Sequence, residues 1–391
     1  MVDENTGSGL VSSEGDGWVY LDHAATTPLA EEAVSAMRPF LEGRHENPSA
    51  SYGGSAKRAV EDARGKVASL FDTDRENVIF TGCGSESDNM AVKGVFETED
   101  GDHIVTSTIE HPAVRNACSF LERKGADVTW VSPDEDGRIN PSDVENAVRE
   151  DTILISIMHA NNETGVIQPL REIGEIADEN DVLFHSDTVQ SAGKIPTPAD
   201  EIGLDLASLS AHKFYGPKGV GALYVRDGTE LEPLIHGGGQ ERGLRGGTEN
   251  VSGIVGMGKA AELALADLEE RKNRLSGLRE RLIEEVRGRT GARLVGDPEN
   301  RLPGYALFCF EDMSGPEIVE ALAERGIAAS SGSACHSGDP EPSRVLKEMG
   351  VERKYATGTL RISMGRKTTE EDVDKVVKNL EEITEEVRSS K

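Results

Sequence analysis

Short apolar runs alternate with segments of helical periodicity from about residue 77 onward. Six of these runs have the length and apolar content of buried strands, namely NVIFTG, HIVTST, TILISIMH, VLFHSD, LASLS and GALYV. Helical patterns separate several of them. Such alternation is typical of a mainly parallel sheet with helices on both faces, so the pattern predicts an α/β fold.

The C-terminal third of the chain has a different pattern. A long charged run of helix-forming residues spans about 251–289, and we predict that it carries the chain into a second domain. Beyond it stand the strand-like segments ALFCF and TLRISMG, a helix capped by Ser314, and a last helix opened by a capping box from Thr368 to Glu371. This part predicts a smaller α+β unit. The predicted regions are a disordered acidic extension at 1–17, a large domain at 18–255 and a small domain at 256–391.

Acidic residues outnumber basic residues by 71 to 42, which gives a formal net charge of −29. This excess argues against nonspecific nucleic-acid binding, because that binding needs a cationic surface. The acidic residues are spread along the chain, as in a protein adapted to a high-salt cytoplasm or in an ordinary acidic protein. No long apolar run predicts a membrane-spanning helix, and the first residues lack the features of a secretory signal. We therefore predict a cytoplasmic protein with no membrane partner.

The acidic excess also predicts a response to salt. Because like charges on a folded surface repel, screening by added salt is expected to stabilise the protein. We expect the melting temperature to rise between low and molar salt, as measured by circular dichroism at constant pH. A melting temperature that stays constant over this range would contradict a salt-adapted surface and would leave the predicted fold untouched.

The four cysteines are far apart and include no CxxC pair, which argues against a metal site and a disulfide framework and favours a reducing compartment. Cys118 lies in a helical pattern and Cys309 in an alternating strand, so both are predicted core residues. Cys335 is different because glycine and serine surround it in SSGSACHSGDPEPS. It is therefore a candidate reactive thiol, with His336 as a candidate base.

Polar residues follow the predicted strands, at the sheet edge where ligands bind in open α/β folds. Gly84 and Ser85 open a helix whose free N–H groups suit a phosphate, although an ordinary capping box from Ser85 to Asp88 is the alternative. The other polar residues after strands are His111, Asn161, Asn162, Glu163, Asp187, Gln190, Ser210, His212 and Lys213. Pyridoxal phosphate needs such a set: a lysine for its aldehyde, a carboxylate for its ring nitrogen, and hydroxyls with a helix N-terminus for its phosphate.

The order of these motifs resembles the cysteine desulfurases of iron–sulfur cluster assembly, from Tyr20 to the C-terminus. The segments that carry the resemblance are YLDHAATTP, ENPSASYGGSAKRAVEDAR, FTGCGSESDNMAVKG, EHPAV, ISIMHANNETGVIQPL, HSDTVQSAGKIP, SLSAHKFYGPKGVGALYV, HGGGQERGLRGGTEN, SSGSACHS and LRISMGR. The SGSAC form is similar to the group with the longer catalytic loop. The resemblance implies the type I fold of pyridoxal-phosphate-dependent transferases and a homodimer, with the cofactor in the large domain and the cysteine loop in the small domain.

The resemblance also implies roles for single residues. Lys213 would hold the cofactor as a Schiff base and carry a proton, and Cys335 would attack the substrate sulfur and carry a persulfide. The implied phosphate contacts are Gly84, Ser85, Ser210 and His212, together with Thr248 of the partner subunit. Around the ring, Asp187 would pair with the nitrogen, Gln190 would contact the oxygen, and His111 would stack on the face. The substrate carboxylate would be held by Asn162 and by a two-pronged contact from Arg361.

The implied activity converts L-cysteine to L-alanine and passes sulfur to an acceptor protein, such as an iron–sulfur scaffold or a tRNA-thiolation enzyme. Three positions depart from the family pattern: His23 stands for asparagine, Cys83 for glycine and Ser85 for threonine. Other interpretations are an aminotransferase, which would not need the Cys335 loop, and a selenocysteine lyase. A noncatalytic sulfur carrier on the same fold would be expected to have lost Lys213 or Cys335.

Overall fold

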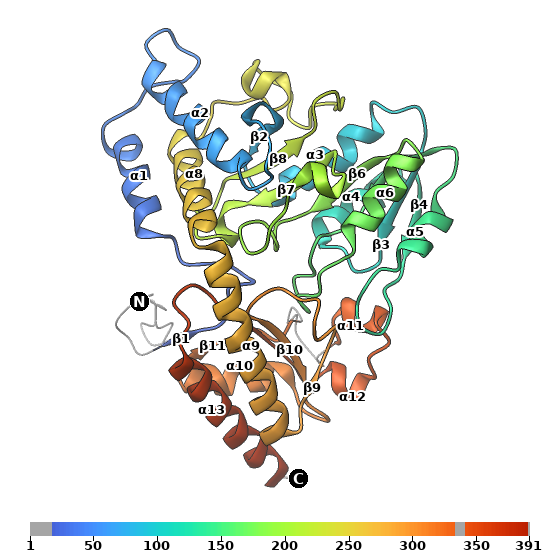
Figure 1. Ribbon diagram of the computed structural model, residues 1–391, viewed down its shortest axis with the longest axis vertical. Helices are drawn as coiled ribbons and strands as arrows, with labels where there is room; N and C mark the ends of the chain where they lie inside the picture. Colours follow the sequence, from blue (N-terminus) through green and yellow to red (C-terminus); the bar gives the residue numbers. More distant parts are fainter. Residues whose placement is uncertain (1–17, 333–340, 390–391) are drawn as a thin grey trace, which may run out of the picture.

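The computed structural model describes residues 18–332 and 341–389 (Figure 1). Its largest feature is a seven-stranded sheet in the order β2-β8-β7-β6-β5-β3-β4. The strands are β2 (Val78–Thr81), β3 (His103–Ser107), β4 (Asp127–Val131), β5 (Thr152–Ser156), β6 (Leu183–Asp187), β7 (Leu206–Ser210) and β8 (Gly221–Val225). Only β8 runs antiparallel to its neighbours, so the predicted mainly parallel sheet and its six strands are confirmed. The seventh strand, β4, was not predicted.

Helices cover both faces of this sheet because successive strand residues point to opposite faces. In β2, Ile79 packs with residues of the helices α3 and α4, whereas Val78 and Phe80 pack on the other side with residues of α2, α6 and α8. The helices around the sheet are α1 (Glu31–Glu42), α2 (Gly54–Ala68), α3 (Gly84–Phe96), α4 (Pro112–Glu122), α5 (Pro141–Ala147), α6 (Leu170–Glu179), α7 (Ala199–Ile202) and α8 (Val251–Ala266). Short 3-10 turns are η1 (Arg75–Asn77), η2 (Ala211–Lys213) and η3 (Gln240–Gly243).

A smaller unit follows, with its own hydrophobic core. Its antiparallel sheet has the order β12-β10-β9, and a second, two-stranded sheet pairs β1 with β11 in parallel. The strands are β1 (Val19–Tyr20), β9 (Arg293–Leu294), β10 (Tyr305–Cys309), β11 (Ile327–Ala328) and β12 (Thr359–Ser363). The helices are α9 (Leu268–Thr290), α10 (Gly315–Glu324), α11 (Arg344–Glu348), α12 (Arg353–Ala356) and α13 (Glu370–Ser389). The strand β1 therefore lies against the C-terminal third of the chain.

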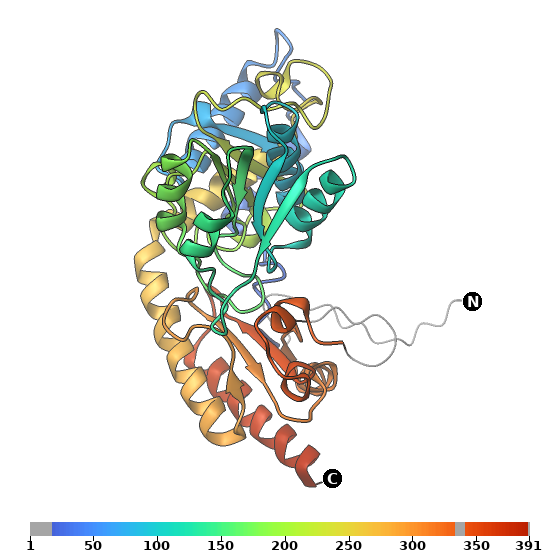
Figure 2. The ribbon, with the colours of Figure 1, turned by 90° about the vertical axis from the view of Figure 1, so that its right-hand side faces the viewer.

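Helices α8 and α9 run along one side of the molecule and connect the two parts, as the side view shows (Figure 2). The sequence predicted one long helix here, but the backbone leaves helical geometry at Asp267, where φ is −124° and ψ is 18°. The predicted capping box is also shifted by one residue, because Thr369 and Asp372 exchange side-chain to backbone hydrogen bonds in place of Thr368 and Glu371. Ser314 occupies the N-cap position of α10 without a side-chain capping bond. The domain boundary near residue 255 stays a prediction.

Within 18–332 and 341–389, no helix combines the length and the apolar surface that a membrane crossing needs.

Candidate functional site

The site forms where the carboxyl ends of β6 and β7 lie side by side. The two strands are parallel neighbours, with Asp187 opposite Ser208, so residues at their ends come together. Asp187 is the last residue of β6, and Ser210 is the last residue of β7. Lys213 follows in the 3-10 turn η2. The predicted grouping of a carboxylate, a hydroxyl and an amine therefore has a structural cause.

The amine of Lys213 points into the loop that follows β1. Its Nζ donates hydrogen bonds to the carbonyl oxygens of Ala24, at 2.6 Å, and Ala25, at 2.8 Å. Burial and the positive charge of Arg361 lower the pKa of Lys213 to about 8, against the opposing effect of two carboxylates. An amine with a lowered pKa is closer to the neutral form that attacks an aldehyde.

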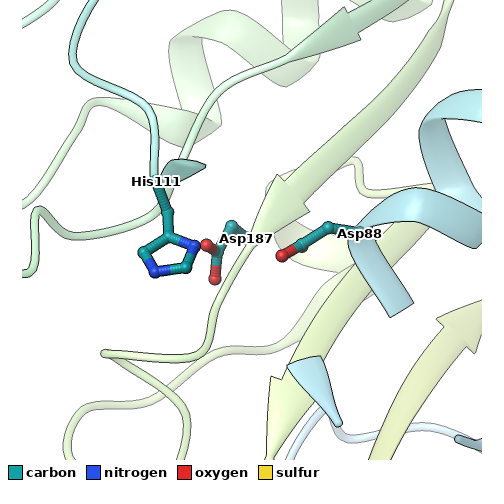
Figure 3. A group of neighbouring side chains, drawn as sticks. All are labelled: Asp88, His111 and Asp187. Atoms are coloured by element: carbon teal, nitrogen blue, oxygen red, sulfur yellow. The ribbon is translucent and has the colours of Figure 1, made fainter. Parts of the chain in front are cut away.

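Asp187, at the end of β6, and His111, at the start of α4, face each other (Figure 3). Burial raises the pKa of Asp187, whereas the charge of His111 and a 2.9 Å hydrogen bond from the backbone N–H of Val189 lower it. His111 is the N-cap of α4, and its Nδ1 accepts a 3.2 Å hydrogen bond from the N–H of Ala113.

The start of α3 lies against the same sheet edge. The helix begins at Gly84, so Ser85 lies in its first turn, and the alternative reading of Ser85 as a capping residue is wrong. A Cβ atom on Gly84 would lie 2.8 Å from Cγ2 of Val189 and 3.3 Å from Cβ of Ser210. Glycine thus allows the free N–H groups of α3 to approach the end of β7. His212 is fixed nearby by a 3.1 Å contact between its Nδ1 and Oγ1 of Thr26.

Arg361, on β12, reaches the site from the smaller unit. Its side chain is almost buried, with Nη2 2.7 Å from a carboxylate oxygen of Asp22 and Nη1 donating to the backbone oxygen of Asn162 at 2.9 Å. Its Nε is buried without a hydrogen-bond partner among the residues that the structure describes. A buried N–H of this kind is costly unless a ligand accepts from it. The sequence did not single out Asp22, whose only signal is its position in YLDHAATTP.

Gln190 is buried next to Lys213 but already has partners. Its Oε1 accepts a hydrogen bond from the hydroxyl of Tyr305 at 2.8 Å, and its Nε2 donates to the carbonyl oxygen of Ala24 at 3.1 Å. The same carbonyl accepts from Lys213. The amide is therefore oriented by its surroundings, and its predicted contact with a cofactor oxygen stays a prediction.

The remaining candidates lie in different places. Thr248 is exposed in the glycine-rich loop between η3 and α8, and its role in the site of a neighbouring subunit stays a prediction. Cys118 and Cys309 are buried, which confirms them as core residues, and Cys83 is exposed at the N-cap of α3. Cys335 and His336 lie outside the described residues.

His23, the residue in place of asparagine, is buried between the two parts of the chain. Its Nδ1 lies 2.9 Å from the carbonyl oxygen of Ser363, and its ring packs edge-on against Tyr20 at 4.9 Å. Burial lowers the pKa of His23 to about 4, so the ring is neutral at pH 7. It packs directly against Gly365, where an added Cβ would overlap the imidazole. His23 thus joins the loop after β1 to the end of β12.

The donor set fits pyridoxal phosphate. An amine of lowered pKa, a buried carboxylate and an open helix N-terminus lie around one sheet edge, and a buried guanidinium N–H without a partner belongs to the residue predicted to hold the substrate. The amine suits the aldehyde of the cofactor, the carboxylate suits its ring nitrogen, and the helix N-terminus suits its phosphate. The guanidinium N–H suits the carboxylate of an amino-acid substrate.

Comparison with known proteins agrees with this fit. Residues 19–376 match the class-V aminotransferase family. The chain is 48% identical over 376 residues to the cysteine desulfurase IscS of Dictyoglomus turgidum, covering 95% of both chains. It is also 48% identical over 375 residues to the IscS of Methanosarcina thermophila, covering 95% of this chain and 93% of the relative.

Solved structures agree with the sequence relatives. A NifS-like protein superposes with a TM-score of 0.88 at 39% identity, covering 94% of this chain and 99% of the other. SspA, solved in complex with cysteine, superposes with a TM-score of 0.77 at 40% identity, covering 88% of this chain and 98% of SspA. The predicted resemblance, fold and pyridoxal phosphate dependence are confirmed, and the chain belongs to the cysteine desulfurases of the class-V aminotransferase family.

Proposed function

We propose that this enzyme removes the sulfur of L-cysteine, releases L-alanine and holds the sulfur as a persulfide on Cys335. In the overall step the C–S bond of the substrate breaks and an S–S bond to Cys335 forms. The thiol hydrogen atoms are redistributed between alanine and the persulfide, so no external oxidant is needed. The observation that best supports this function is the free Nε of Arg361 in a site that also holds Lys213 and Asp187.

Pyridoxal phosphate supplies an electron sink for the bonds that change at the substrate. The residues proposed to hold it are Lys213, Asp187, His111, Gln190, Gly84, Ser85, Ser210 and His212, with Thr248 of the partner subunit. Asp187 would keep a proton on the ring nitrogen through its negative charge, and His111 would present its ring to the cofactor. Lys213 would bind the cofactor aldehyde covalently, and its Nζ would also carry a proton to and from the substrate carbon atoms.

Arg361 and Asn162 are proposed to hold the substrate carboxylate. Asp22 and the backbone oxygen of Asn162 fix the two terminal nitrogens of the guanidinium group, which leaves Nε for the substrate. Asp22 therefore orients Arg361 before the substrate arrives. The substrate carboxylate binds Nε alone if Asp22 stays on Nη2, or it binds two nitrogens if it displaces Asp22. Both arrangements require the planar guanidinium group.

Arg361→Lys is expected to raise KM for L-cysteine by about 10- to 100-fold, because a charge-assisted hydrogen bond contributes about 1.5–3 kcal/mol. The lysine keeps the charge but loses the fork of donors. Steady-state kinetics would measure the change, and the cofactor spectrum should stay the same. Arg325→Lys is the control, since Arg325 pairs with Glu386 on the surface. An unchanged KM in Arg361→Lys would contradict the substrate role.

The activity itself is tested by incubating the purified protein, supplied with pyridoxal phosphate, with L-cysteine in the presence of a reductant. We expect alanine and sulfide in equal amounts. Formation of a keto acid without alanine would instead indicate an aminotransferase. Selenocysteine should be assayed in parallel, and turnover of selenocysteine alone would identify a selenocysteine lyase.

The active unit is proposed to be a homodimer in which Thr248 completes the site of the neighbouring subunit. The preceding Gly247 has a φ of +113°, a conformation that glycine adopts readily, so the loop has the backbone freedom for a close approach to a phosphate. We expect a dimer in analytical ultracentrifugation. A fully active monomer would contradict this assembly.

Mixed dimers test the shared site more sharply. Lys213→Ala and Thr248→Ala subunits, unfolded together and refolded, would form hybrids in which one site has both an intact Lys213 and an intact Thr248. We expect the mixture to be more active than the sum of the separate variants. No gain would mean that Thr248 serves its own subunit.

The sulfur acceptor is proposed to be a protein of the cytoplasm, either an iron–sulfur scaffold or a tRNA-thiolation enzyme.

A further inference from the structure

A second buried carboxyl group lies directly behind Asp187 and has no role so far. Asp88 projects from α3 and is only 1% exposed. Side-chain atoms of Asp88, Asp187 and His111 all lie within 4.8 Å of one another (Figure 3). Within 18–332 and 341–389, the Oδ1 atom of Asp88 is buried without a hydrogen-bond partner. An isolated carboxylate is expensive in such a place, so its protonation state needs an explanation.

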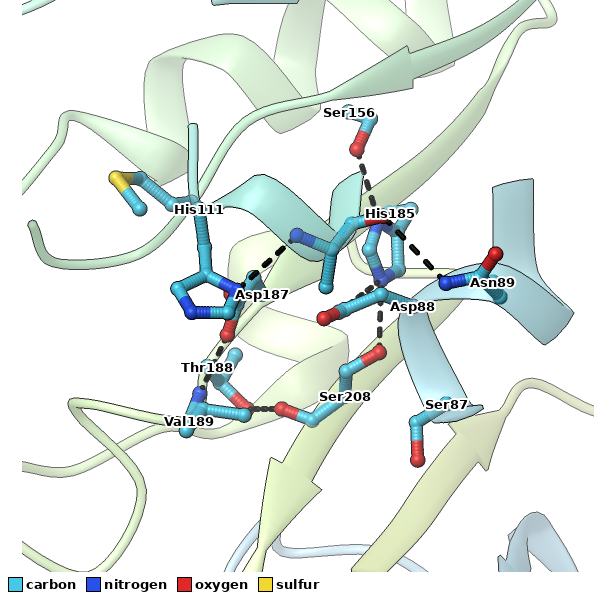
Figure 4. A network of polar contacts seen from close by, with 12 residues as sticks. Ser87, Asp88, Asn89, His111, Ser156, His185, Asp187, Thr188, Val189 and Ser208 are labelled. Carbon is cyan, nitrogen blue, oxygen red and sulfur yellow. Dashed lines mark hydrogen bonds and ion pairs between the residues drawn. The ribbon is translucent and has the colours of Figure 1, made fainter. Parts of the chain in front are cut away.

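The two carboxyl groups have different surroundings, although they are close to each other. Asp187 accepts a hydrogen bond from the backbone N–H of Val189 and is stabilised as an anion by His111 and Lys213. The groups that contact Asp88 on the side away from Asp187 are the hydroxyl of Ser208 and the ring of His185 (Figure 4), and neither of them carries a positive charge at neutral pH. The charged form is therefore favoured at Asp187 and not at Asp88.

The imidazole beside Asp88 does not supply a positive charge. Nε2 of His185 lies 3.8 Å from Oδ1 of Asp88 and 3.0 Å from the hydroxyl oxygen of Ser208. On the other side of the ring, Nδ1 lies 2.9 Å from the hydroxyl oxygen of Ser156. Burial lowers the pKa of His185 to about 3, so this ring is neutral at pH 7. The hydroxyls of Ser156 and Ser208 thus hold a neutral imidazole between them.

The other ionisable groups around Asp88 lie on β6 and at the starts of α3 and α4. They are Asp187 on β6, Glu110 before α4, His111 at the start of α4, Cys83 at the start of α3, and the neutral His185. Burial raises the pKa of Asp88, the negative charge of Asp187 raises it further, and the hydrogen bond with Ser208 opposes these effects. Two carboxyl groups at this separation do not both ionise at low cost.

We propose that Asp88 is a positioning residue that stays protonated at neutral pH, so that Asp187 is the single carboxylate available to the ring nitrogen of the cofactor. The role of Asp187 rests on the proposed function, whereas the proton on Asp88 does not. A neutral Asp88 fills the space behind Asp187 with a polar group and adds no second negative charge. The chain from Asp88 through Ser208 and His185 to Ser156 holds that group in place.

The proton is detected directly in the cofactor-free protein by infrared spectroscopy, through the carbonyl stretch of a protonated carboxylic acid. Burial also raises the pKa of Glu110, to about 8, so two buried acids are expected in this region at pH 7. Asp88→Asn should remove one of the two carbonyl bands, and Glu110→Gln should remove the other. Each of these bands should shift in frequency when the wild type is transferred to deuterium oxide. An Asp88→Asn spectrum with the same acid bands as the wild type would overturn the proposal.

The positioning role is tested by cofactor binding across pH. Asp88→Asn keeps a neutral polar group, so its affinity for pyridoxal phosphate and the pH profile of the bound cofactor's visible absorption should stay within about threefold and half a pH unit of the wild type. Asp187→Asn should bind pyridoxal phosphate more than tenfold more weakly. The bound cofactor should also lose the visible absorption of the form that is protonated on the ring nitrogen. Circular dichroism would verify folding of each variant. Loss of affinity in folded Asp88→Asn equal to that in Asp187→Asn would show that the Asp88 charge is needed and would overturn the proposal.

The two measurements separate this proposal from the proposed function. If the protein failed to turn over L-cysteine, the infrared result on cofactor-free protein would still decide whether Asp88 carries a proton. If Asp88 were ionised, the proposed turnover of L-cysteine would be unaffected, because it depends on Lys213 and Cys335.

Discussion

Replacing Lys213 by alanine is expected to abolish turnover of L-cysteine and the yellow colour that bound pyridoxal phosphate should give the protein. The amine is the only proposed covalent anchor of the cofactor, and it is also the proposed proton carrier at the substrate. Loss of a nucleophile and a general base together is expected to lower the rate by more than about 1,000-fold. Sulfide release and the visible absorbance that survives gel filtration would measure the two effects.

Lys218 provides a matched control for this experiment. It lies five residues farther along the same segment and is exposed, whereas the amine of Lys213 donates to two backbone carbonyls inside the site. Lys218→Ala should keep both colour and activity. A Lys213→Ala protein that retained covalently bound cofactor after borohydride reduction would refute the assignment.

The strands of the large sheet were predictable because most of their residues are buried on both faces. Continuous apolar runs such as VIFT and GALYV need no partner segment to be recognised. The missed strand β4, DVTWV, is at the edge of the sheet, and four of its five residues are partly or fully exposed. An edge strand with mixed polar and apolar residues lacks the signal of a buried strand.

The main site residues were predictable for a topological reason. Asp187 ends one strand and Lys213 follows another, and the two strands are parallel neighbours, so a sequence that identifies the strands also brings these residues together. Asp22 was not predictable in this way. It reaches Arg361 because β1 pairs with β11, more than 300 residues away, and no local pattern contains that pairing.

The break between α8 and α9 likewise depends on tertiary contacts. Neither proline nor glycine interrupts the sequence around Asp267. Its carboxylate forms ion pairs with Arg271, one turn further along α9, and with Arg366, in the loop between β12 and α13. Nη2 of Arg271 also donates to the backbone oxygens of Gly193 and Ala264. These contacts fix the position of the break between α8 and α9, where the chain passes from the large sheet to the smaller unit.

Asp88 shows a limit of a different kind. In the sequence it completes a local capping pattern with Ser85, which suggests an exposed carboxylate. In the structure it is buried beside Asp187, because α3 packs its inner face on the sheet. Burial, and therefore the protonation state, is a property of packing that the local pattern does not contain.

Cys335→Ser is expected to eliminate sulfide release and persulfide formation while the protein still binds pyridoxal phosphate and L-cysteine. The hydroxyl of serine cannot form the S–S bond that accepts the sulfur. The binding groups Lys213, Asp187 and Arg361 come from other segments and stay intact. Spectra on addition of L-cysteine should therefore change as in the wild type, and alanine and sulfide should fall to the background of the assay.

The location of the transferred sulfur distinguishes Cys335 from the other cysteines. Burial raises the pKa of the Cys118 and Cys309 thiols, that of Cys309 to about 12, so neither is a thiolate at neutral pH. Cys83 is the competitor, because it is exposed at the start of α3 beside the proposed phosphate contacts. Cys83→Ser is therefore the matched control and should keep its activity.

Mass spectrometry of peptides after one turnover without reductant should find one added sulfur on the Cys335 peptide, both in the wild type and in Cys83→Ser. An ordinary thiol with a pKa near 8.5 is only about 3% thiolate at pH 7, so single-turnover rates should rise with pH until the attacking thiol is ionised. The same pH dependence should be absent from L-cysteine binding by Cys335→Ser. Added sulfur on Cys83, with Cys335→Ser still active, would move the persulfide to the start of α3 and refute Cys335 as the nucleophile.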